Sequence, residues 1–371
     1  MEKKTNVDQI FELFKKNNDD IKEIKKELSK NTGSNNFCIV KEIKYKKKTL
    51  VAKLIRTKKN SEICNYSLFL NMRNVNIIKI KKIYKELIDE FYYYLIIKEK
   101  AILKDMEKLT HHYHKNNLLK LIYNPFVDSL GDNLLRFFLN QIIDGLNMIY
   151  TNNIIHLNIN PSNILVTANL TIKLSSFSNA IEYKENDDKN TIIIVPKADK
   201  GYISPEYHIN SSMSIEDAKK QDYFALGSTL FYFMFGEKLI NYSTKKEPII
   251  DFDIIINRLE KRINFIKSRA YLNKGFITLL CSLINYKSKD RLSFDKIRRN
   301  KWLNENRDYI ESIFNSIYDD EEKLILELQK SDFLYKKEKE MNYCNTSKFK
   351  FKKSKKEFNF CEFNESKRMG K

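Results

Sequence analysis

The sequence lacks the features of disulfide-stabilised, zinc-binding and membrane-spanning proteins. Its five cysteines are scattered and form no C-x-x-C pair, so neither a disulfide framework nor a zinc site is indicated. The longest apolar runs, FYYYLII and FITLLCSLI, are far shorter than the roughly 18 to 20 residues that cross a bilayer. The opening stretch, MEKKTNVDQIFELFKKNNDD, has no apolar core of signal-peptide type. We expect a soluble intracellular protein, cytoplasmic or nuclear, with no transmembrane segment.

Acidic residues are few relative to basic ones, which gives the 371 residues a net charge of +19. Lysine, asparagine and isoleucine are abundant throughout, so compositional bias explains most of this excess. Attraction to acidic proteins, anionic lipid or nucleic acid is the alternative. The stretch KFKFKKSKKEF predicts a loosely ordered basic tail that suits any of these three partners, although a solvated tail is the simpler interpretation.

The spacing of apolar residues divides the chain into a strand-rich part and a helical part. Between Ile10 and Leu28 the spacing is roughly helical, which predicts a helix outside the main domain. From Phe37 to about Lys100 the patterns predict two β-hairpins, with a short helix at SEICNYSLFLNM between them. Beyond Leu109 the periodicity is helical, as in NLLRFFLNQIIDGLNMIY, and DDEEKLILELQKSDFLY predicts a further helix.

Six short motifs follow one another in an order that resembles the protein kinase family. LVAKLI resembles the family's V-A-I-K strand, and IIHLNINPSNIL resembles its catalytic loop, H-R-D-x-K-P-x-N. SFS stands where the family has D-F-G, and YISPE resembles A-P-E. DYFALG resembles the start of a buried helix, and KDRLSFDKIRRNKWL resembles the last conserved stretch. The resemblance covers about residues 31–304, and YISPE and NKWL are nearer to Ser/Thr than to Tyr kinases.

Within these motifs, the residues that the resemblance assigns to catalysis are replaced. Asn158 stands at the position of the catalytic base, and Ser176 stands at that of the metal-binding aspartate. An amide does not accept a proton at neutral pH, and a hydroxyl is a poor substitute for the anionic oxygen that Mg²⁺ prefers. Leu157 replaces the arginine that would clamp a phosphorylated activation loop. Asn163 is the one metal-side ligand that the resemblance leaves, so we expect no intact catalytic residue and poor Mg²⁺ binding.

The nucleotide-binding positions are partly kept. The resemblance makes Lys53 the residue that would hold the α and β phosphates, with one more surface lysine as the alternative. In GSNNFCIV, Gly33 is kept but Asn35 and Cys38 replace the glycines that let backbone amides approach phosphate. The usual glutamate partner of the lysine falls at Asn65, with Glu62 one turn earlier. The remaining candidates, which would line an apolar adenine slot, are Val40, Val51 and Leu165.

The architectural positions of the family are better kept than the chemical ones. The resemblance assigns four residues to a stack of side chains that links the two lobes: Phe69, Ile80, His156 and Phe177. It makes Asp222 the residue that anchors this stack. Glu206 and Arg291 fall at the positions of a buried ion pair. Such a pair typically costs about 3–5 kcal/mol to break, because one charge is left buried and alone.

We therefore expect an α+β, two-lobed protein-kinase-like fold, with a small antiparallel β-rich N-lobe and a larger, mainly α-helical C-lobe. The expected divisions are a helical extension over 1–30, the N-lobe over 31–100, the C-lobe over 101–306 and a helix with a basic tail over 307–371. The expected function is that of a pseudokinase, a scaffold or allosteric regulator that binds a protein partner, with an active kinase as one candidate partner. The alternative is an active but atypical Ser/Thr kinase with relocated metal ligands. ATP binding is expected to be weak.

Overall fold

The computed structural model describes thirteen stretches of the chain, and the statements below concern these residues alone: 7–32, 37–58, 65–101, 105–108, 110, 129–167, 169–184, 193–194, 199–208, 210, 212–240, 252–269 and 272–317. Gly33, Asn35, Glu62 and the basic tail lie outside them, as does the helix expected at DDEEKLILELQKSDFLY. No helix in the described stretches is long and apolar enough to cross a membrane.

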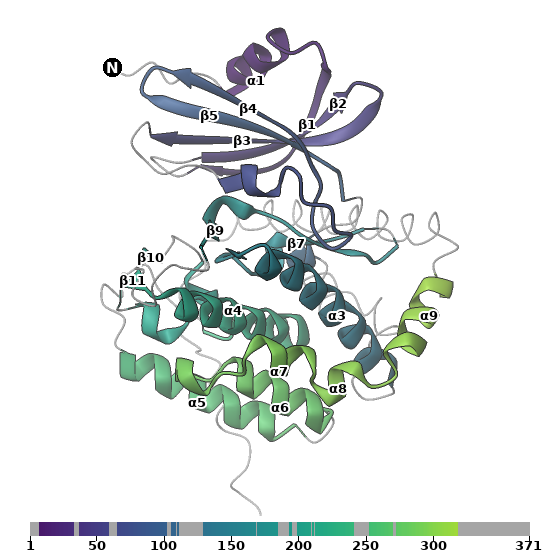
Figure 1. The fold of residues 1–371 in the computed structure, drawn as a ribbon, viewed down its shortest axis with the longest axis vertical. Helices are drawn as coiled ribbons and strands as arrows, with labels where there is room; N and C mark the ends of the chain where they lie inside the picture. Colours follow the sequence, from purple (N-terminus) through teal and green to yellow (C-terminus); the bar gives the residue numbers. More distant parts are fainter. Residues whose placement is uncertain are drawn as a thin grey trace, which may run out of the picture. The chain divides into compact units, whose positions relative to one another are not determined.

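A five-stranded antiparallel sheet forms the N-terminal part of the fold (Figure 1). Its strands lie in the order β1-β2-β3-β5-β4, with bounds β1 Ile21–Thr32, β2 Phe37–Tyr45, β3 Lys48–Lys58, β4 Ile80–Ile88 and β5 Phe91–Lys98. The two hairpins predicted from alternation, β2–β3 and β4–β5, are confirmed. The short helix between them is a 3₁₀ helix, η1, over Asn65–Phe69.

The helix expected between Ile10 and Leu28 is wrong beyond Lys16. Helix α1 covers Val7–Lys16, but β1 begins at Ile21 and pairs with β2 along its length. The register of this pair shifts at three places within β1. Each shift interrupts the two-residue alternation of a strand, so the apolar residues of β1 acquire a spacing that resembles that of a helix.

The two faces of the sheet are covered by different structures. On one face, Ile10, Phe11 and Phe14 of α1 are buried with alternate residues of the sheet such as Ala52 and Ile97. On the other face, Tyr94 and Ile96 belong to the large core that continues into the helical part. Directly paired residues of an antiparallel sheet project to the same side, so register assigns each strand residue to one of these faces.

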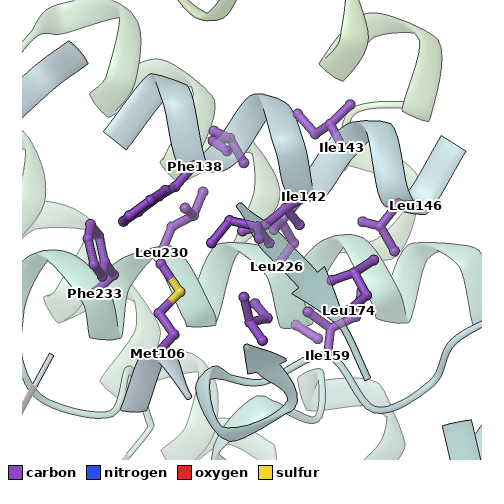
Figure 2. Close-up of a cluster of buried hydrophobic side chains, with 14 of the residues drawn as sticks. Met106, Phe138, Ile142, Ile143, Leu146, Ile159, Leu174, Leu226, Leu230 and Phe233 are labelled. Carbon is purple, nitrogen blue, oxygen red and sulfur yellow. The ribbon is translucent and has the colours of Figure 1, made fainter. Parts of the chain in front are cut away.

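Helices dominate the C-terminal part. Their bounds are α3 Ser129–Thr151, α4 Ile215–Phe235, α5 Phe252–Lys267, α6 Lys274–Leu283, α7 Phe294–Arg298, α8 Lys301–Asn304 and α9 Arg307–Ile317. Side chains of α3 and α4 meet in the centre of the core with Met106, Ile159 and Leu174 (Figure 2). At Gly227 of α4, an added Cβ would lie 2.7 Å from Ile284 Cγ2, so only glycine permits α6 to approach this closely. The expected fold class, an antiparallel N-terminal sheet followed by a mainly helical region, is confirmed.

Short elements and the loops between them, from α3 to α4, carry seven of the fifteen candidate site residues. They are the strands β6 Ile154–Ile155, β7 Ile164–Val166, β8 Ile172–Leu174, β9 Ile181–Glu182, β10 Ile193–Ile194 and β11 Ser212–Met213. The 3₁₀ helices of this region are η3 Pro161–Asn163, η4 Phe177–Asn179, η5 Lys200–Tyr202 and η6 Pro205–His208. A further 3₁₀ helix, η7 Ser288–Asp290, lies between α6 and α7. β6 pairs with β9 and β7 pairs with β8, which brings the loop after β6 close to the segment after β8.

Candidate functional site

The loop from His156 to Asn163 is held from beneath by one buried carboxylate. The backbone N–H groups of His156 and Leu157 donate to the two oxygens of Asp222 at 2.9 and 2.8 Å. The Tyr150 hydroxyl donates to the same carboxylate at 3.2 Å. Burial raises the pKa of Asp222 to about 7, although these hydrogen bonds act in the opposite direction. This anchor fixes Leu157 in a left-handed backbone conformation, with φ 53°.

Leu157 packs into an apolar cluster. It is buried together with Ile203, Tyr207 and Met213, which belong to the segment between Asp199 and α4. An arginine at this position would need an anionic partner, whereas leucine contacts the same segment through apolar packing. The loop and the following segment are therefore joined without a guanidinium or a phosphate.

Three asparagines of this loop bind one another. Asn160 Nδ2 donates to Asn158 Oδ1 at 3.1 Å, and Asn163 Nδ2 donates to the Asn158 carbonyl at 2.8 Å. Asn160 Oδ1 in turn accepts from the hydroxyl and the backbone N–H of Ser162 at 2.6 and 3.1 Å. These are neutral groups, so the loop is well hydrogen-bonded but carries no carboxylate of its own.

Lys53, in β3, reaches Ser176, which follows β8. The Lys53 ammonium donates to Ser176 Oγ at 3.1 Å and to the Tyr66 hydroxyl at 2.6 Å. Lys53 is 8% exposed, and Ser176 has a left-handed backbone with φ 71° and ψ 60°. A serine in this conformation is strained, and the surrounding structure must hold it there. The side chain thereby points at the lysine although 123 residues separate the two in sequence.

Tyr66 is a site residue that the sequence reading missed. Counting back from NVNII, which resembles the family's H-P-N-I-V, predicts Asn65 as the partner of Lys53. The segment is the 3₁₀ helix η1, whose side chains turn by a different angle per residue than those of an α-helix. Asn65 Nδ2 instead donates to the Ala180 carbonyl. Tyr66 is fully buried, and a buried tyrosine hydroxyl usually needs a hydrogen-bond partner, which is here the Lys53 ammonium.

Aromatic rings connect η1 to the loop after β6. The Phe69 and Phe177 rings are stacked with centroids 3.6 Å apart, and His156 meets Phe177 edge-on at 5.5 Å. Ile80 lies in the same buried core. His156 is buried, which lowers its pKa to about 4, and its Nε2 lies 3.2 Å from the Ser175 carbonyl oxygen. The histidine is therefore a neutral packing residue at physiological pH.

Glu206 and Arg291 form a two-bond ion pair. The Arg291 Nη1 and Nη2 atoms donate to the two carboxylate oxygens at 2.7 and 2.8 Å. Arg291 Nε donates to the Asn285 carbonyl at 2.7 Å. The Arg291 side chain is completely buried and that of Glu206 is 18% exposed. The guanidinium is thus desolvated but paired, which is the arrangement in which removal of one partner is most damaging.

Residues 22–303 match the protein kinase domain family. The chain belongs to the protein kinase family. The match begins within β1, earlier than the motifs alone indicate, because the whole of β1 is part of the kinase sheet.

Curated relatives of this kinase domain include three proteins named serine/threonine-protein kinase PLK4. The Xenopus laevis protein is 25% identical over 220 residues, which are 59% of this chain and 20% of that protein. The Danio rerio protein is 26% identical over 171 residues, 46% of this chain and 16% of that protein. The Drosophila virilis protein is 25% identical over 221 residues, 58% of this chain and 24% of that protein. The match therefore spans about a fifth of the length of these relatives.

The nucleotide-binding candidates of the kinase domain lie partly on one face of the sheet. Val40 pairs with Lys53, and Val51 lies two residues from Lys53 in β3, so all three project to the same side. Leu165, half-buried in β7, forms an isolated β-bridge with Asp105. Two of the expected adenine-lining residues therefore lie on the side of the sheet from which Lys53 projects.

The donor set does not fit Mg²⁺. Kinase domains generally use ATP with Mg²⁺, which favours carboxylate oxygen. Here Ser176 Oγ accepts from Lys53, and Asn163 offers one neutral amide. Across the described stretches there is no group of three or more His, Cys, Asp or Glu side chains that could hold a metal ion. The nearest acidic residue downstream of Ser176 is Glu182, an exposed residue of β9, and Asp187 and Asp188 lie outside the described residues.

Proposed function

We propose that this kinase domain is a pseudokinase, a protein-binding scaffold or allosteric regulator whose chemical positions have been replaced. The contact between Lys53 and Ser176 carries the proposal. In an active kinase the position of Ser176 supplies the carboxylate that bridges Mg²⁺ to the phosphates. The neutral hydroxyl of Ser176 contacts Lys53 and cannot supply that carboxylate.

The positions around it support the same conclusion. Phosphoryl transfer needs phosphates in line, cations to offset their charge, and a carboxylate beside the attacking hydroxyl. Asn158 holds the last of these positions, and its amide is engaged by Asn160. Both replacements remove negative charge, so the site loses its means of binding metal and of accepting a proton.

A protein-binding role is favoured because the architecture is kept where the chemistry is lost. The Asp222 anchor, the Phe69–Phe177 stack and the Glu206–Arg291 pair are complete. These contacts hold the loop that begins at His156, and Phe177 and Glu206 of the segment between β8 and α4, a part of kinases that contacts other proteins. We infer a protein partner, with an active kinase as one candidate, and weak, Mg²⁺-independent nucleotide binding.

A radiolabelled-ATP assay tests the proposal. The wild type, Asn158→Asp, Ser176→Asp and the double variant are each assayed with Mg²⁺ and with Mn²⁺. We expect no transfer by the wild type or by Asn158→Asp, and at most metal-dependent ATP binding by Ser176→Asp. Wild-type transfer that disappears in Lys53→Ala would show instead an active Ser/Thr kinase with relocated ligands.

A further inference from the structure

Lys98, the last residue of β5, is a buried cation with no partner among the residues that the structure describes. It is 8% exposed, and within the described part of the chain its ammonium makes no hydrogen bond or ion pair. Nearby lysines differ, since Lys100 pairs with Glu42 at 2.6 Å and Lys173 pairs with Glu99 at 2.9 Å. A buried ammonium without a counter-charge is costly and uncommon in proteins.

The strand register places Lys98 on the same side of the sheet as Lys53. Lys98 pairs directly with Val51 in β3, and Val51 lies two residues from Lys53. Ile97, the preceding residue, belongs to the opposite face, where it is buried beneath α1. Lys98 therefore projects toward the side on which Lys53 meets Ser176.

The electrostatic surroundings of Lys98 are unfavourable to its charge. Burial, and after it the nearby charge of Lys53, lower the pKa of Lys98 to about 7, with Cys38 acting in the opposite direction. Glu42 lies on the same face, opposite Val51, but its carboxylate is bound by Lys100 and lies 3.8 Å from Lys25. No carboxylate among the described residues forms an ion pair with Lys98 or is among the causes of its pKa shift.

We propose that Lys98 and Lys53 together form an anion site that takes a multiply charged phosphate group without a divalent metal. A polyphosphate placed between two ammonium groups replaces their mutual repulsion by two charge-assisted contacts. Lys98 then supplies positive charge that a metal ion supplies in an active kinase. The inference rests on the proposed function in one respect, the loss of the metal-binding carboxylate at Ser176. The shared chemistry has two sources, a nucleotide or a small phosphate compound.

Binding to the full-length protein in the presence of EDTA tests the site. Inorganic pyrophosphate, ATP and adenosine are titrated by calorimetry against wild type, Lys98→Met and Lys82→Met. Lys82 is an exposed lysine of β4 and serves as the matched control. We expect pyrophosphate to bind wild type and Lys82→Met equally, and Lys98→Met at least about tenfold more weakly. Tighter binding of ATP than of pyrophosphate would identify a nucleotide as the ligand, and equal binding would identify the phosphate compound.

The opposite results are equally clear. Absence of pyrophosphate and ATP binding to wild type, or unchanged binding to Lys98→Met, would overturn the proposal. So would adenosine binding as tightly as ATP with no effect of Lys98→Met. As a measurement on unaltered protein, amine acylation read by mass spectrometry should show Lys98 protected by pyrophosphate and Lys82 not protected. The phosphotransfer assay is separate, so failure of the anion site leaves the pseudokinase proposal standing, and the reverse also holds.

Discussion

At the scale of single residues, the charged side chains of this kinase domain differ mainly in how completely they are paired. Arg291 is buried with two bonds to Glu206, Lys53 is buried with polar oxygen partners, and Lys98 is buried without a partner among the described residues. The same charge therefore stabilises the fold at one position and destabilises it at another. The consequences can be measured one residue at a time.

Removal of Arg291 should be among the most destabilising single changes. Arg291→Ala leaves the Glu206 carboxylate unpaired, and we expect a loss of about 3–5 kcal/mol in the free energy of unfolding. Arg262 makes an equally close pair with Glu237, at 2.6 and 3.0 Å, but on the surface. Arg262→Ala should cost about 0–1 kcal/mol. Chemical denaturation compares the two, and Lys53→Ala should also be milder than Arg291→Ala. Equal losses would mean that the Glu206 pair is no more than a surface contact.

Lys98 should make the stability of the kinase domain depend on pH. The pKa of Lys98 is 10.5 when unperturbed and about 7 in the folded protein. Between these two pH values Lys98 is therefore protonated in the unfolded chain and mostly neutral in the folded protein. The free energy of unfolding should therefore rise with pH across this range. Below about pH 7, where Lys98 is charged in both states, the destabilisation caused by its burial should be at its full value. Lys98→Met should raise the free energy of unfolding at neutral pH by as much as about 5 kcal/mol, the upper limit that the shift allows.

Denaturation of wild type and Lys98→Met at neutral and alkaline pH measures this difference. The stabilising effect of the substitution should shrink as the pH rises toward 10.5. A difference that does not change with pH would show that packing, and not the charge, distinguishes the two proteins.

At the scale of elements, α1 completes the outer face of the sheet. Phe14 is fully buried in the cluster with β2, β3 and β5, whereas the adjacent Leu13 is 37% exposed. Phe14→Ala should lower the free energy of unfolding by about 3–5 kcal/mol, because it removes a large side chain and leaves a cavity. Leu13→Ala, the neighbouring control, should cost much less. Similar midpoints for the two variants in a denaturant titration would show that α1 is not part of the cooperative unit.

The segment after β8 is fastened by two kinds of contact. The Phe177 ring stacks on Phe69, and the Leu157 cluster holds the chain around Ile203 and Tyr207. Neither contact needs a phosphate or a metal ion. The described parts of this segment are thus held by apolar packing, which agrees with the proposed role as a binding scaffold.

At the scale of the whole molecule, the net charge of +19 favours anionic partners. A solvated tail is the simpler interpretation; if instead the tail binds anionic lipid, the full chain should bind vesicles that contain it more strongly than neutral vesicles, with affinity that falls steeply as salt is added. A variant that ends at residue 317 lacks KFKFKKSKKEF and should bind less. Cosedimentation measures both effects. Binding that is independent of salt would exclude a charge-driven mechanism. Equal binding by the shortened chain would show that the basic residues that attract the vesicle lie outside the tail.

The sequence by itself determined the two hairpins, the kinase fold and two replaced catalytic positions, because each of these follows from a local pattern of residues. Alternation predicts the β2–β3 and β4–β5 hairpins, and the order of six motifs indicates a kinase fold and locates Asn158 and Ser176. The identity of a residue is enough to say that an amide is no base and that a hydroxyl is no carboxylate. These statements need no knowledge of what lies across the fold.

Only the tertiary structure decided what depends on register and on contacts between distant residues. Three register shifts make β1 resemble a helix in sequence, and pairing with β2 reveals the strand. The 3₁₀ turn of η1 brings Tyr66 to Lys53 in place of Asn65. Lys98 is one lysine among many until its pairing with Val51 fixes the face on which it lies. A one-residue change of register would move its ammonium to the other side of the sheet, and no local pattern specifies that choice.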